Sequence, residues 1–76
     1  MKASELVRRE VGESAWSLAR LGREMGITPS SMQDRLRSER GLATSFAHRA
    51  LDLLGWELVA VPKGTKLPPR SVRIDG

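Results

Sequence analysis

The sequence contains no cysteine, a single histidine and no cluster of acidic residues. Without cysteine, neither a disulfide nor a thiolate metal site can stabilise the fold. Without a nucleophile beside a base, or a set of metal ligands, no catalytic site can be drawn. We therefore expect a protein that is not an enzyme and that uses no cofactor and no metal. The histidine, His48, is expected on the surface of a helix.

Long apolar segments are also missing. No run reaches the roughly 18 apolar residues that a membrane-spanning helix requires. The first ten residues, MKASELVRRE, lack the apolar core of a signal peptide. Both absences predict a cytoplasmic protein that has no membrane partner.

The chain has 76 residues and a formal net charge of +4. A chain of this length is expected to form one small domain that buries only about 60% of its unfolded surface. Self-association is then a common source of further stability. The positive charge suits a polyanion such as nucleic acid, and the alternative is a solvated surface without a partner.

Apolar residues at helical spacing predict four helices, at about residues 4–11, 18–25, 29–38 and from 44 or 45 to Gly55. Gly12 is expected to end the first helix, and Gly41 to break the chain before the fourth. Either Thr44 or Ser45 is expected to cap the fourth helix.

After Gly55 the pattern changes to alternation. Trp56–Val61 is rich in strand-forming residues, and residues 71–75 alternate again after a loop with three prolines. A lone two-stranded hairpin is barely stable in water, and an exposed strand edge invites pairing. We therefore predict that the first strand pairs with its copy in a second subunit. The expected dimerisation residues are Trp56, Leu58, Val59 and Val61, with the tryptophan alternatively in the core.

Residues 17–36, SLARLGREMGITPSSMQDRL, carry signals for two short helices joined by a tight turn. Ser17 and Thr28 are candidate N-caps, and Pro29 suits the first position of a helix. Gly26 can adopt the left-handed conformation that ends a helix. The remaining signals are packing positions: Trp16 against Leu21, Gly22 at a close approach, and Met32 with Leu36 facing inward.

This segment resembles the helix-turn-helix of Cro/repressor-like (XRE-family) regulators of phages and bacteria. The matching elements are Leu21-Gly22, Met25-Gly26, Ile27-Thr28 and Ser31-Met32, and RLRSERGL and LDLLG extend the resemblance to about residues 5–55. The tail GWELVAVPKGTKLP is similar, more weakly, to C-terminal strands that join the dimer in some members. Two positions depart from the family pattern: Gly22 replaces the usual alanine, and Leu18 replaces a frequent glutamine.

The resemblance implies a mainly α, four-helix lambda-repressor-like domain over residues 1–55, with a C-terminal strand or hairpin in residues 56–76. It implies a homodimeric transcriptional regulator, a repressor, that binds a palindromic site on double-stranded DNA and is nucleoid-associated. The helix at about 29–38 would enter the major groove.

On that helix the expected base-contacting residues are Ser30, Gln33, Asp34 and Arg37. Gln33 can pair with adenine, and Arg37 can reach guanine or a phosphate. Asp34 can accept a hydrogen bond from cytosine, or it can orient a neighbouring arginine, either Arg37 or Arg35. Arg35 is alternatively packed or paired with Glu39. The expected phosphate-contacting residues are Ser17, Arg20, Thr28, Pro29, Ser31 and Arg40. Ser17 and Thr28 are alternatively caps only, and Arg20 a solvated residue.

The function of the tail stays open in the sequence. Its basic residues Lys63, Lys66 and Arg70 are expected either to follow the backbone of flanking DNA or to form a solubilising linker. An alternative to the repressor is an antitoxin with the same DNA-binding body, whose C-terminal segment binds a toxin protein. A further alternative is a protein-interaction module that has lost DNA binding.

Overall fold

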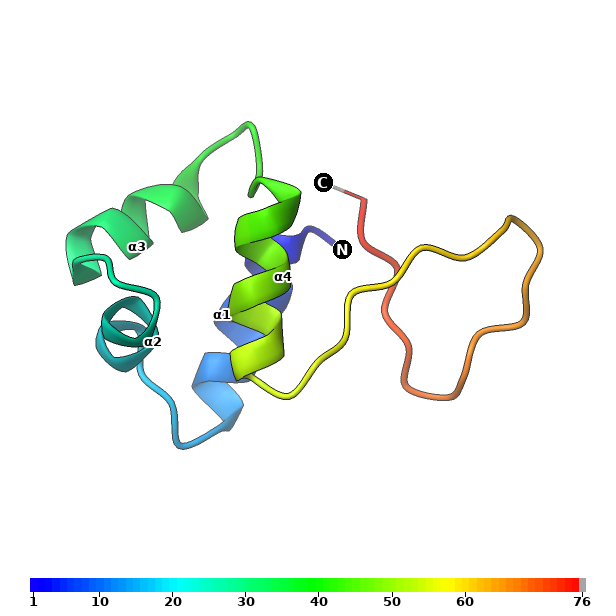
Figure 1. Cartoon of the computed structure of the whole chain (residues 1–76), viewed down its shortest axis with the longest axis horizontal. Coiled ribbons are helices and arrows are strands. Elements are labelled where there is room, and N and C mark those ends of the chain that lie inside the picture. Colours follow the sequence, from blue (N-terminus) through cyan, green and yellow to red (C-terminus); the bar gives the residue numbers. More distant parts are fainter. Residues whose placement is uncertain (76) are drawn as a thin grey trace.

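The computed structural model describes residues 1–75, which form four helices followed by an irregular tail (Figure 1). The helices are α1 (Ala3–Glu13), α2 (Leu18–Glu24), α3 (Pro29–Arg37) and α4 (Thr44–Leu53). The expected mainly helical class is confirmed. Gly76, the last residue of the expected tail, lies outside the described residues. Across the described residues, no helix has both the length and the apolar character needed to cross a membrane.

The helices enclose one core. α1 packs against α3 and α4, and α2 packs against α3. Figure 1 places α1 behind α4, with α2 and α3 together on one side and the tail on the other. All four helices contribute to the buried cluster, which consists of Leu6, Val7, Leu21, Met25, Met32, Leu36, Ala50 and Leu51. Full burial of such a larger side chain contributes about 1.5–3 kcal/mol, so this cluster fixes how the helices sit on one another.

The caps around the turn form as the sequence predicts. The Ser17 hydroxyl accepts a hydrogen bond from the Arg20 amide at 3.0 Å, at the start of α2. The Thr28 hydroxyl accepts from the Ser31 amide at 3.1 Å, and Pro29 occupies the first turn of α3. Gly26 has φ 74°, the left-handed conformation that lets the chain turn between the helices.

Two helix ends differ from the prediction. α1 continues through Gly12 to Glu13, so the prediction that this glycine ends the helix is wrong. Gly12 is absent from the positive-φ glycines of the structure, and a glycine with negative φ can remain helical. At α4 the expected caps Thr44 and Ser45 are wrong, because the N-cap is Ala43, which has no capping side chain. The buried residues Ala47, Ala50 and Leu51 hold α4 through packing instead.

The tail contains neither of the two expected strands. Among residues 1–75, no segment is assigned as a strand, including 56–61 and 71–75. A strand requires a neighbour that satisfies its backbone groups. The connection between the two segments holds three prolines and Arg70 at φ 70°. Within residues 1–75, no backbone hydrogen bond joins the two segments.

The tail is nevertheless attached to the helices. Trp56, Val72 and Ile74 are half-buried against the core cluster. The indole Nε1 of Trp56 donates to Glu10 Oε1 in α1 at 2.6 Å. The Asp75 amide donates to the Met1 carbonyl at 3.0 Å, which places the last described residues beside the first (Figure 1). The division into residues 1–55 and 56–76 stays a prediction.

Candidate nucleic-acid interface

The candidate reading face lies on α3. Met32 and Leu36 are 0% and 4% exposed, so one side of the helix is fixed against the core. With about 3.6 residues per turn, Ser30, Asp34 and Arg37 fall on the opposite side, whereas Gln33 lies at the edge of that side, next to Leu36. Ser30, Asp34 and Arg37 are exposed, and Gln33 is half-buried. The structure therefore brings Ser30, Asp34 and Arg37 together on one outward face, with Gln33 at its edge.

A close backbone contact sets how α3 leaves the turn. Gly22 is buried in α2, and a β-carbon there would lie 3.1 Å from the Ile27 carbonyl oxygen and 3.5 Å from that of Thr28. The Ile27 amide also donates to the Gly22 carbonyl at 2.8 Å. The chain just before α3 is thus held directly against α2. Figure 1 shows the outcome, with α2 seen end-on and α3 lying across it.

The expected phosphate-contacting residues lie at two places. Ser17, Arg20, Thr28, Pro29 and Ser31 are near the starts of α2 and α3, whereas Arg40 follows α3 in the connection to α4. The oxygen of each capping hydroxyl accepts a hydrogen bond from a backbone amide. The O–H group of the same hydroxyl is therefore available to donate a hydrogen bond of its own. The Arg20 guanidinium lies 4.0 Å over the Trp16 ring, a cation–π contact that the sequence did not indicate.

The structure adds two arginines at the junction of α3 and α4. The Arg35 guanidinium lies 4.7 Å over the Phe46 ring although the residue is exposed, and its alternative pairing with Glu39 does not form within residues 1–75. Two shallow hollows of about 410 and 250 Å³ share Arg35 and Phe46, with Arg40 lining the first and Arg49 the second. Arg49 belongs to no motif of the sequence, and only the fold, in which α3 and α4 both pack on α1, brings it here.

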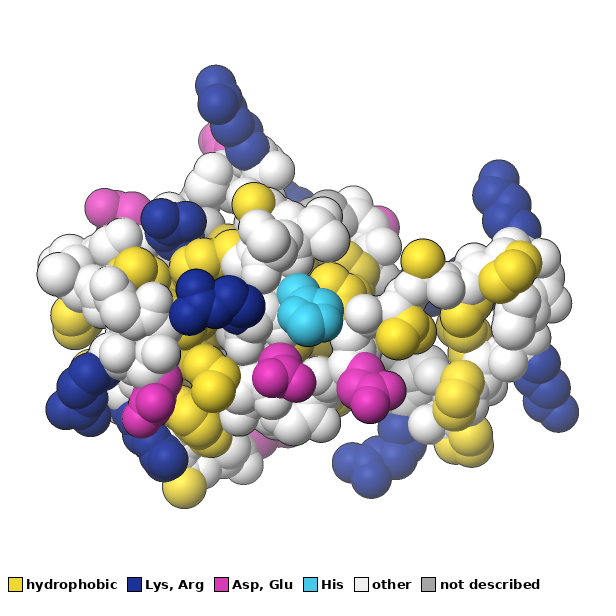
Figure 2. All heavy atoms as spheres, viewed as in Figure 1, with side chains coloured by type: hydrophobic (Ala, Val, Ile, Leu, Met, Phe, Trp, Pro, Cys, Tyr) yellow, Lys and Arg dark blue, Asp and Glu magenta, His cyan; other side chains and the backbone are white. Residues whose placement is uncertain are grey.

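Within residues 1–75, the arginines of this region form no ion pairs with acidic side chains. Over the described part of the chain, ion pairs join only the Met1 amine to Asp75 at 3.2 Å and Arg9 to Glu10 at 3.6 Å. Neither pair involves Arg37 of α3. Figure 2 shows Lys and Arg side chains on the half of the molecule that holds α2 and α3, where acidic side chains also lie, and further Lys and Arg side chains around the tail.

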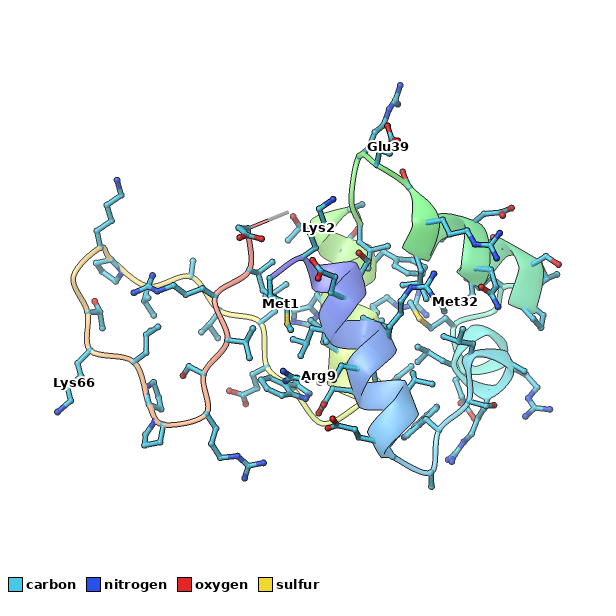
Figure 3. All side chains as sticks on the ribbon, turned by 180° about the vertical axis from the view of Figure 1, so that it is seen from behind. Met1, Lys2, Arg9, Met32, Glu39 and Lys66 are labelled. Carbon is cyan, nitrogen blue, oxygen red and sulfur yellow. The ribbon has the colours of Figure 1, made fainter. Side chains whose placement is uncertain are left out.

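The basic loop of the tail lies far from α3. Lys63, Lys66 and Arg70 are exposed, on a loop at the opposite end of the 39 Å long axis from α3 (Figure 1). Figure 3 shows Lys66 pointing away from the helices at the tip of this loop. Within one subunit, the loop therefore does not extend the face formed by α3.

The four expected dimerisation residues divide into two kinds. Trp56 and Leu58 are half-buried, and the Trp56 indole is engaged with Glu10. Val59 and Val61 are 70% and 47% exposed, among the few large hydrophobic residues on the surface. Only the two valines are thus free to meet another chain without rearrangement. His48 is exposed on α4, as expected.

No known protein family, curated protein or solved structure matches this chain. The resemblance carried by residues 17–36 therefore stays a prediction from the sequence motif.

Proposed function

We propose that this chain is a sequence-specific, double-stranded DNA-binding regulator with a lambda-repressor-like fold, acting as a homodimer. The observation that carries the proposal is the polar outward face of α3, opposite the buried Met32 and Leu36. A helix that is fixed on one side and polar on the other can enter the major groove, where each base pair presents a distinct pattern of donors and acceptors.

The residues of this face have separate roles in the proposal. Gln33 pairs with the N6 and N7 atoms of adenine, and Ser30 near the start of α3 contacts a neighbouring base edge. Arg37, at the last position of α3, reaches a guanine or a phosphate. Asp34 accepts from the amino group of cytosine or orients Arg37, and its charge repels phosphates in other registers.

Phosphate contacts would fix the position of α3 without reading sequence. Arg20 and Arg40 provide charge before and after α3, and the capping hydroxyls of Ser17 and Thr28 donate their free O–H groups. Pro29 and Ser31 lie on the same approach to α3.

The dimer would place two α3 helices about 34 Å apart, so that they read the two halves of a palindromic site. In the proposal the C-terminal strand forms only across this dimer, where a second chain supplies the missing backbone partner. Occupation of a promoter by the dimer then represses transcription, which is consistent with a cytoplasmic, nucleoid-associated protein.

The proposal is tested by selecting binding sites from randomised double-stranded oligonucleotides. We expect a palindromic site. On that site, Gln33→Ala should weaken binding about 5- to 150-fold, because a good bidentate base contact contributes about 1–3 kcal/mol. His48→Ala, an exposed change on α4, is the matched control and should leave affinity unchanged. The absence of any enriched sequence at low salt would contradict the proposal.

An antitoxin is the second candidate function. The exposed Val59 and Val61 lie on the tail, away from α3, so a toxin could bind there while the same body holds DNA. A toxin gene adjacent to the gene for this chain, with loss of toxin binding in Val59→Asp, would favour this candidate over a simple repressor.

A further inference from the structure

The segment after α4 carries a self-complementary row of side chains. Residues 56–62 contain no turn or bend. Trp56 and Leu58 are half-buried and Glu57 is exposed, and every residue from Val59 to Pro62 is exposed. Lys63 begins the turn that follows, in which the Thr65 amide donates to the Pro62 carbonyl at 3.2 Å. Continued as a strand through Lys63, the segment would place Glu57, Val59, Val61 and Lys63 on one side. This row has an acid at one end, a base at the other and two valines between them.

The backbone of the same segment lacks partners. Within residues 1–75, no amide or carbonyl group from Glu57 to Val61 makes a hydrogen bond. The returning end of the tail does not supply them, because Asp75 and Arg73 bond to Met1 instead. An unpaired run rich in β-branched residues is a template for a strand from another chain.

We propose that residues 57–63 pair antiparallel with the same residues of a second copy of this chain, about a two-fold axis at Ala60. In this register Glu57 lies opposite Lys63 of the partner subunit, and Val59 lies opposite Val61 of the partner subunit. Symmetry repeats both pairs. An axis at Val59 would set Glu57 against a valine, and an axis at Val61 would set Val59 against a lysine. Only the axis at Ala60 matches charge with charge and valine with valine.

Proline also fits this register. Antiparallel strands alternate between pairs that exchange two hydrogen bonds and pairs that exchange none. With Ala60 in a non-bonded pair, Val59 and Val61 form the bonded pairs, and Pro62 falls in a non-bonded pair. Its missing N–H then removes no bond between the subunits. Trp56 stays with Glu10 in this arrangement, so the interface uses Val59 and Val61 and not the tryptophan.

The pairing rests on the homodimer of the proposed function and specifies its register. It is tested on the full chain without DNA, by sedimentation equilibrium from 1 to 100 µM. We expect Glu57→Lys and Lys63→Glu each to raise the dimer dissociation constant roughly tenfold or more, since like charges then face each other twice. An equimolar mixture of the two variants should dimerise as the unmodified chain does, because each heterodimer restores both opposite-charge pairs. The double variant E57K/K63E should do the same.

Lys66→Glu is the matched control. It makes the same charge change at an exposed residue of the same loop, outside the paired segment, and should leave the dissociation constant unchanged. Far-UV circular dichroism checks that every variant keeps its helices. A monomeric unmodified chain at 100 µM, an unchanged dissociation constant in both single variants, or no recovery in the mixture would each overturn the pairing. A dimer with these properties that selects no DNA sequence would overturn the proposed function alone.

Discussion

Two regions of this chain carry equally clear sequence patterns but reach different structures. Residues 17–37 are predicted as two capped helices and form α2 and α3, with both caps in place. Residues 56–61 and 71–75 are predicted as strands joined by a loop, and residues 56–75 form an irregular tail that packs on the helices. The difference follows from where each element finds its backbone partners. A helix satisfies its interior amides within its own segment, whereas a strand depends on another segment.

The two regions should also differ in how far their side chains support folding. Met32→Ala should lower the free energy of unfolding by about 2–5 kcal/mol, because it leaves a cavity beside a fully buried side chain. Val59→Ala should change it by less than about 0.5 kcal/mol, since Val59 is 70% exposed. Urea titrations followed by circular dichroism at 1 µM measure both. Equal losses would show that the tail supports the helical core as strongly as α3 does.

The hydrogen bond from Trp56 to Glu10 is one of the contacts that connect the tail to the helices. Trp56→Phe removes the donor and should lower the free energy of unfolding by about 1–2 kcal/mol, because the bond ends on a carboxylate. Glu10→Gln keeps an oxygen acceptor and should have a smaller effect. The same titrations compare the two variants. If Trp56→Phe has no effect, the tail is held by the apolar contacts of Val72 and Ile74 and by the bonds of Arg73 and Asp75 to Met1.

Substitutions at two glycines within helices, Gly12 in α1 and Gly22 in α2, should also differ in their effect on stability. Gly12→Ala should stabilise the protein by about 0.5–1 kcal/mol, or several degrees in Tm, because alanine favours a helix and open space surrounds the site. Gly22→Ala should give no such gain, since its β-carbon would lie 3.1 Å from the Ile27 carbonyl oxygen. Thermal unfolding measures both. An equal gain at the two positions would contradict a tight approach between α2 and the turn.

Much of the helical half was predictable because its signals are local. The caps at Ser17 and Thr28, the turn at Gly26 and the inward pair Met32 and Leu36 each depend on residues within about one helical turn. These signals also identify the outward residues of α3. The end of α1 beyond Gly12 was missed, because one glycine is tolerated where the surrounding residues continue the helix.

Contacts between distant residues were not predictable in the same way. The Arg35–Phe46 and Trp56–Glu10 contacts join residues 11 and 46 positions apart, and no local pattern specifies such pairs. The Arg20–Trp16 contact is local, but the arginine also suited a solvated position. Residues 56–61 form no strand because no other described segment pairs with them. The composition of residues 56–61 cannot predict whether such a partner segment is present.

The sequence by itself therefore determined the four helices, their ends to within about two residues, and the side of α3 that faces outward, because capping and apolar spacing act within a helix. The tertiary structure decided how these helices are joined to the rest of the chain. It set the approach of α2 to the turn through Gly22, fixed the tail on α1 through Trp56, and gave residues 57–61 no backbone partner among residues 1–75. Those outcomes depend on which distant groups meet, and only the folded chain brings them together.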